Sequence, residues 1–175
     1  MSTMGTAIGR IVSEDVSIRV TQLDVLYELI TNAIQANATK ITCTLHSTDR
    51  PLEQEQIEVV KRKVDSVTIV DNGDGFTDKN YKSFCTYRTE HNMALGCKGV
   101  GRLVFLKVFE KITFESHLVD VQEVRSFKFD LNFDTDNWKK ETIAVESNST
   151  KVELSKITQQ YFNPERHVDR RIEVN

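Results

Sequence analysis

The pattern of apolar and polar positions in residues 23–38, LDVLYELITNAIQANA, has the period of an α-helix. Thr21 and Asp24 have the spacing of a capping box, which predicts that the helix begins there. Asn37 suits the left-handed conformation in which many helices end. We therefore predict one amphipathic helix. Its predicted buried face consists of Leu23, Leu26, Leu29, Ile30, Ala33 and Ile34.

On both sides of this helix the pattern changes to one that is typical of β-strands. Residues 8–20 fit a short strand or an extended arm, and residues 56–64 fit either a short helix or a strand. Strands are predicted, from alternation or β-branched content, at residues 40–46, 66–70, 111–116, 124–131, 141–147 and 150–154. Turn residues separate the last four of these, which predicts an antiparallel meander.

Three other stretches depart from the β pattern. Residues 77–98 are polar and weakly periodic, and their length indicates a functional loop or lid, with a short helix near residues 79–84. The apolar residues 102–110 predict a buried helix. Residues 161–175 form a polar tail, and we expect it to lead to a downstream domain.

Composition narrows the class of protein. The 175 residues fit one domain, and 23 basic against 26 acidic side chains leave a net charge of −3. This charge does not favour direct binding of nucleic acid. We expect no membrane association, because no apolar run is long enough to span a bilayer. Three cysteines without CxxC spacing indicate neither disulfides nor zinc, and a reducing cytoplasm fits best.

Glu28 and Asn32 project side by side from the predicted helix, because they are four residues apart. An amide oxygen can ligate a hard cation while a neighbouring carboxylate orients a water molecule. On this motif alone, the polar face of an ordinary amphipathic helix is the commoner explanation.

A second motif, DNGDGF, begins at Asp71 and directly follows the strand predicted at residues 66–70. A carboxylate at this place can accept a hydrogen bond from an exocyclic amine, and glycines let a flat ring approach the backbone. A tight turn is the alternative. A calcium loop is excluded, because the twelfth position from Asp71 is Lys82 and not glutamate.

The third motif, GxxGxG, consists of Gly96, Gly99 and Gly101 before the helix predicted at residues 102–110. Backbone amides at the start of a helix can bind phosphate. The motif is neither a Rossmann nor a Walker pattern, because a polar stretch and not a strand precedes it, and no GK[ST] is present.

Taken in this order, the three motifs resemble those of the GHKL ATPases: gyrase, heat-shock chaperones, histidine kinases and mismatch-repair ATPases. The sequence STKVEL at residues 149–154 looks like the fourth motif of that family, with Thr150 on a late strand. The resemblance runs from about residue 8 to residue 163. Residues 28–41 look most like the heat-shock and mismatch-repair branches. GCKGVGRL is similar to stand-alone bacterial ATP-binding proteins, some of which act in antiviral defence.

The resemblance implies an α/β (α+β) two-layer sandwich, the Bergerat fold, in which helices cover one face of a mixed, mostly antiparallel sheet. It also implies ATP and Mg²⁺ as ligands. By position, Glu28 would be the general base and Asn32 the magnesium ligand. Asp71 would bind the adenine amine, with Thr150 in support. The other residues implied to contact the nucleotide are Gly73, Gly75, Lys98, Gly99, Val100, Gly101 and Arg102.

Two hypotheses follow from this resemblance. In the first, the chain is an ATPase whose binding and hydrolysis of ATP drive lid closure and a conformational change or homodimer formation. In the second, it is a nucleotide-gated interaction module with little turnover, which acts on a partner protein. Glu28 favours the first. Gln35, which stands where the two branches carry aspartate, and the missing downstream domain favour the second. Histidine-kinase catalysis is disfavoured, because no helix pair with a phosphoacceptor histidine precedes the motifs.

Overall fold

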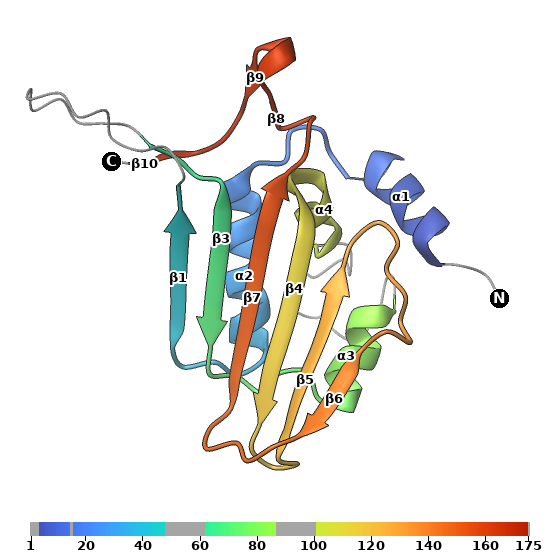
Figure 1. Ribbon diagram of the computed structural model, residues 1–175, viewed down its shortest axis with the longest axis vertical. Coiled ribbons are helices and arrows are strands. Elements are labelled where there is room, and N and C mark those ends of the chain that lie inside the picture. The colour runs from blue at the N-terminus through green and yellow to red at the C-terminus, as the bar shows by residue number, and fades with distance from the viewer. Residues whose placement is uncertain (1–3, 15, 48–61, 87–100, 175) are drawn as a thin grey trace, which may run out of the picture.

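A six-stranded sheet forms one layer of the protein in a computed structural model that describes residues 4–14, 16–47, 62–86 and 101–174 (Figure 1). Every pair of neighbouring strands in it is antiparallel. In spatial order the strands are β1 (Ile41–His46), β3 (Ser66–Asp71), β7 (Ser149–Ile157), β4 (Phe109–Leu118), β5 (Glu123–Phe129) and β6 (Lys139–Thr142).

Helices form the second layer on one face of this sheet (Figure 1). They are α1 (Met4–Glu14), α2 (Gln22–Gln35), α3 (Asp78–Cys85) and α4 (Leu103–Val108). The predicted two-layer α/β fold is therefore confirmed. None of the helices in the described part of the chain is long and apolar enough to cross a membrane.

Alternation along the strands places the core between the two layers. In β4 the side chains of Ile112, Phe114, Ser116 and Leu118 are buried, while those between them are at least partly exposed. Phe114 stacks on Phe127 of β5, with ring centroids 4.7 Å apart. Aromatic pairs of this kind typically add about 0.5–1.5 kcal/mol to the stabilisation from buried area. Ser116 is the polar member of this buried series.

Helix α2 begins and ends as its sequence predicts. The Thr21 side chain accepts a hydrogen bond from the Asp24 N–H, and the Asp24 carboxylate accepts one from the Thr21 N–H, which completes the capping box. Asn37 has φ +62°, the expected left-handed conformation.

The predicted buried face of α2 is wrong at its margins. Leu23 and Ile34 are 51% and 60% exposed. Val25, Leu29 and Ala33, spaced four residues apart, are buried in their place. Both stripes have helical spacing, so the sequence pattern did not distinguish them. The contact with the sheet selects the stripe centred on Leu29.

The expectation of a strand or extended arm at residues 8–20 is wrong, because residues 4–14 form α1. Ile8 and Val12, four residues apart, are buried in the core. The helix predicted at residues 102–110 is shorter than expected. It ends at Val108, and Phe109 already pairs with Ile157 in the sheet. A short apolar run fits both a helix and a buried strand, and here tertiary packing decides.

The predicted antiparallel meander is confirmed for β4, β5 and β6, but the prediction is wrong for β7. This last strand returns to the middle of the sheet and lies between β3 and β4. Strand β6 ends at Thr142, so residues 143–147 do not belong to it. The strands predicted at residues 40–46 and 66–70 and the helix near residues 79–84 are confirmed.

The tail beyond residue 160 packs against the start of α2. Gln22 is 1% exposed, and its side chain donates to the Val64 carbonyl and accepts from the Ile172 N–H. Tyr161 Oη accepts a hydrogen bond from the Gln22 N–H at 3.0 Å. Within the tail, β8 (Phe162–Asn163) pairs with β9 (Val168–Asp169). The last strand of the tail, β10 (Glu173–Val174), pairs with β2 (Arg62–Lys63), which precedes β3.

Candidate functional site

Strand register brings three polar side chains from distant parts of the chain into one row. Asp71, the last residue of β3, lies opposite Thr150 of β7, and Thr150 lies opposite Ser116 of β4. Directly opposed residues in antiparallel strands share a face of the sheet. All three side chains are buried. We call Asp71, Gly73, Gly75, Ser116 and Thr150 the Asp71 cluster.

The Asp71 carboxylate is held by the loop that follows it. Its Oδ1 accepts a hydrogen bond from the Gly73 N–H at 2.8 Å. Burial raises the pKa of Asp71 above its ordinary value, and the Gly73 hydrogen bond opposes this change. Within the described residues no further hydrogen bond reaches this carboxylate. Its second oxygen is therefore able to accept a hydrogen bond from a ligand.

At two positions of the DNGDGF loop, Gly73 and Gly75, close contacts leave no room for a side chain. A Cβ on Gly73 would lie 2.5 Å from the carbonyl oxygen of Ala36, which is a backbone atom. Gly75 has φ +65°, and a Cβ there would lie 3.1 Å from the hydroxyl oxygens of both Ser116 and Thr150. The loop backbone thus lies directly against the end of α2 and against the two hydroxyls.

Hydrogen bonds join this loop to the end of α2. The Asp74 N–H donates to the Ala36 carbonyl at 2.7 Å, and Asn37 Nδ2 donates to Asp74 Oδ2 at 2.7 Å. Asn72 Oδ1 accepts hydrogen bonds from the N–H groups of Thr39 and Lys40. The helix that carries the first motif is therefore attached to the loop that carries the second.

Glu28 contacts the third motif as well as its own helix. Its side chain is hydrogen-bonded to that of Asn32. A Cβ on Gly101 would overlap the Glu28 carboxylate, so this carboxylate packs on the Gly101 Cα. Burial raises the pKa of Glu28 above its ordinary value, while the Asn32 hydrogen bond and the charge of Arg102 oppose this shift. We call Glu28, Asn32, Gly101 and Arg102 the Glu28 cluster.

Arg102 also contacts the end of α3. Its guanidinium donates to the Thr86 carbonyl at 3.0 Å and lies 5.2 Å from the centre of the Phe84 ring. Its expected role as a phosphate contact stays a prediction. The same holds for Gly96, Lys98, Gly99 and Val100, which lie outside the described residues.

The side chains near Asn32 can bind magnesium only if most of the ligands of the ion come from phosphates and water. In the described part of the chain, no group of three or more His, Cys, Asp or Glu side chains could hold a metal ion. Mg²⁺ at nucleotide sites takes most of its ligands from phosphates and water, with one or two from the protein. The Asn32 amide beside the Glu28 carboxylate fits this sparse arrangement.

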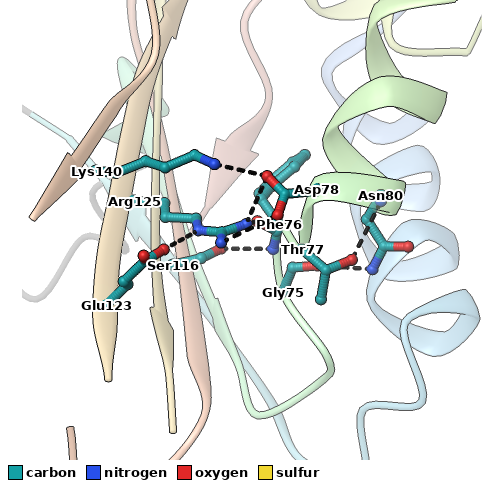
Figure 2. A network of polar contacts seen from close by, with 9 residues as sticks. All are labelled: Gly75, Phe76, Thr77, Asp78, Asn80, Ser116, Glu123, Arg125 and Lys140. Atoms are coloured by element: carbon teal, nitrogen blue, oxygen red, sulfur yellow. Dashed lines mark hydrogen bonds and ion pairs between the residues drawn. The ribbon is translucent and has the colours of Figure 1, made fainter. Parts of the chain in front are cut away.

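Sequence reasoning missed two buried residues next to the site, Ser116 and Arg125. Figure 2 shows Arg125 reaching from β5 to the loop, where it donates to the Phe76 carbonyl at 3.1 Å. Arg125 also pairs with Glu123 at 2.7 Å and with Asp78, the first residue of α3, at 3.5 Å. Both missed residues occupy core positions in the alternation of their strands. A polar residue at such a position was the available signal.

Residues 20–161 match the model of the histidine kinase-, DNA gyrase B-, and HSP90-like ATPase family. The chain belongs to this family. The predicted GHKL relationship is thereby confirmed, and membership supports ATP binding and hydrolysis in general terms. A search of curated proteins found no significant match.

Two ATPase domains are among the solved structures that resemble the chain. The MutL ATPase domain of Aquifex aeolicus, complexed with ADP, is 17% identical with a TM-score of 0.45, over 82% of this chain and 44% of that one. The 43K ATPase domain of Thermus thermophilus gyrase B, in complex with an aminocoumarin, is 17% identical with a TM-score of 0.49. This match covers 79% of this chain and 34% of the gyrase chain. The chain therefore spans less than half the length of either.

Proposed function

We propose that this chain binds ATP with Mg²⁺ and hydrolyses it to ADP and phosphate. The observation that carries the proposal is the contact of the Glu28 carboxylate with Gly101, combined with the hydrogen bonds between the end of α2 and the DNGDGF loop. Through α2, the first motif lies against the second motif and against Gly101, the last residue of the third. This is the arrangement that a nucleotide needs, with a base contact and phosphate contacts supplied together.

The Asp71 cluster recognises the adenine base. The second Asp71 oxygen accepts a hydrogen bond from the adenine amine, and Thr150 supports this contact from the neighbouring strand. Gly73 and Gly75 let the flat ring approach the loop backbone, where a side chain would collide with its neighbours.

The Glu28 cluster acts on the phosphates. Glu28 orients the attacking water and accepts its proton, and burial favours this role because it raises the pKa of the carboxylate. Asn32 ligates Mg²⁺, which neutralises phosphate charge when bound. Gly99, Val100 and Gly101 present backbone amides to the phosphates, and Lys98 and Arg102 add positive charge.

The conformational part of the proposal concerns residues 77–98. Helix α3 forms the first part of this predicted lid, which closes over ATP and drives a conformational change or homodimer formation. A second candidate function is a nucleotide-gated module with little turnover that acts on a partner protein. The feature that favours it is Gln35, which adds no negative charge near the Glu28 cluster.

Calorimetric titration of ATP, with and without Mg²⁺, tests the proposal. We expect Mg²⁺ to strengthen binding to the wild type. Asp71→Asn removes a charge-assisted hydrogen bond and should weaken binding about a hundredfold. The matched control is Asp120→Asn, which changes an exposed aspartate in the turn between β4 and β5 and should bind like the wild type. Unchanged affinity in Asp71→Asn would contradict the adenine assignment.

A further inference from the structure

Ser116 lies behind Thr150, on the far side from Asp71, and is fully buried. Its Oγ is 3.0 Å from Thr150 Oγ1 and accepts a hydrogen bond from the Phe76 N–H at 3.1 Å. These are its side-chain hydrogen bonds among the described residues. Ser116 therefore links the strand that carries Thr150 to the loop that carries Gly75.

Counting donors and acceptors determines which hydroxyl donates in the Ser116–Thr150 pair. A hydroxyl has one proton and two lone pairs, and the Phe76 N–H already occupies one lone pair of Ser116. If Thr150 donated to Ser116, the Ser116 proton would be buried without an acceptor, which is costly. If Ser116 donates to Thr150, only one lone pair of Ser116 stays unused, which proteins tolerate more readily.

The second arrangement leaves Thr150 with its own proton, next to the Asp71 carboxylate on the neighbouring strand. The pocket then presents an acceptor beside a donor. The edge of adenine has the complementary order, with the amine as donor and ring N1 as acceptor. A 6-oxopurine has the reverse order, with O6 as acceptor and N1–H as donor.

We propose that Ser116 is a positioning residue that makes Thr150 a hydrogen-bond donor to ring N1, directly or through one water, and so selects adenine over 6-oxopurines. This inference rests on the proposed ATP binding. It goes beyond the adenine amine contact of Asp71, because it assigns the second half of base recognition to a residue that does not touch the base.

The surrounding contacts fix Ser116 relative to the loop. Ser116 binds the Phe76 N–H, while Arg125, its partner on β5, binds the Phe76 carbonyl (Figure 2). The backbone of Phe76 is thus held on both sides by the sheet. This places Gly75 against the hydroxyl pair, where a Cβ would lie 3.1 Å from each oxygen.

The test compares ATP, ITP and 1-deaza-ATP, in which C–H replaces ring N1, by calorimetry on the wild type and Ser116→Ala. We expect the wild type to prefer ATP over 1-deaza-ATP about threefold to tenfold, the value of one hydrogen bond. In Ser116→Ala the Thr150 hydroxyl keeps its proton but is no longer held in one orientation, so this preference should narrow, and the preference for ATP over ITP should narrow with it. Ser155→Ala, a partly buried serine farther along β7, is the control and should keep both preferences.

The outcomes distinguish the selectivity proposal for Ser116 from the proposal that the chain binds ATP. If Ser116→Ala weakens ATP and 1-deaza-ATP equally, Ser116 is only structural and the selectivity proposal is overturned, while ATP binding stands. A wild type that binds no nucleotide overturns both.

A second pair of variants keeps the test decisive if Ser116→Ala does not fold. Thr150→Ser retains the hydroxyl and should keep the preference for ATP over 1-deaza-ATP, whereas Thr150→Val should lose it. A preference retained in Thr150→Val also overturns the proposal.

Discussion

The Asp71 cluster and the Glu28 cluster hold their polar groups in different ways. In the Asp71 cluster, backbone N–H groups bind the side chains: Gly73 donates to Asp71, and Phe76 donates to Ser116. These side chains stand on strands that are paired with their neighbours. In the Glu28 cluster, Glu28 interacts with Asn32 on the same helix, with the charge of Arg102 and with the Cα of Gly101.

This difference distinguishes the proposed base-binding site, the Asp71 cluster, from the proposed site of hydrolysis, the Glu28 cluster. Groups that the sheet and a tight loop hold in place are preorganised and lose little freedom when a ligand binds. The groups around Glu28 depend on α2 meeting the start of α4, and Arg102 also contacts the end of α3. We therefore expect base binding to be sensitive to changes in the loop, and hydrolysis to be sensitive to changes in how the helices meet.

The largest effect is expected from Glu28→Gln. Removing the general base should lower hydrolysis by about 10²- to 10⁴-fold, and ATP affinity should stay unchanged because the Asp71 cluster is intact. Phosphate release and calorimetry measure the two quantities. Glu115→Gln, on an exposed position of β4, is the control. If Glu28→Gln hydrolyses ATP at the rate of the wild type, the general base is another residue. If the wild type itself does not hydrolyse ATP, the nucleotide-gated module is favoured.

Gly101→Ala should affect hydrolysis more than binding. The added methyl group would overlap the Glu28 carboxylate and displace it. A displacement of about 1 Å at a catalytic group can cost about a hundredfold in rate. Single-turnover hydrolysis, with ATP affinity measured in parallel, checks this expectation. Equal loss of rate and affinity would mean that the two clusters are not separable.

Gly75→Ala should do the opposite and weaken base binding. The left-handed conformation of Gly75 costs a residue with a side chain about 1–2 kcal/mol, and the methyl group would crowd the Ser116 and Thr150 hydroxyls. Urea unfolding and calorimetry measure the losses. Gly9→Ala in α1 is a matched control, because among the described residues no atom outside the local backbone of this helix lies within 4 Å of the added Cβ. It should raise stability by about 0.5–1 kcal/mol. Unchanged affinity in Gly75→Ala would contradict the proposed approach of the base to this loop.

The smallest effect concerns the titration of Asp71. Burial raises the pKa of Asp71 in the folded protein. The ionised carboxylate therefore lowers the free energy of unfolding at neutral pH, and this loss is relieved as the pH falls through the raised pKa. A hydrogen bond from the adenine amine favours the carboxylate, so ATP should lower the pKa, and affinity should fall as the pH falls through the value of the free protein. Carboxyl ¹³C NMR with and without ATP measures this. A pKa that ATP leaves unchanged would contradict the amine contact.

The sequence by itself determined the local features of this protein. Thr21 and Asp24 predicted the start of α2, and Asn37 predicted its left-handed end, because capping depends on residues within one turn of each other. The order of the motifs predicted the family and the fold. The roles of the site residues stay predictions, although the structure brings Glu28 to Gly101 and Asp71 to Thr150.

Only the tertiary structure decided the features that depend on distant partners. The return of β7 to the middle of the sheet places Thr150 between Asp71 and Ser116, and alternation within one strand contains no information about which strands pair. The buried stripe of α2 and the helical state of residues 4–14 were also decided by packing. Local hydrogen bonds are encoded in neighbouring residues, whereas strand order and buried faces emerge only when the whole core assembles.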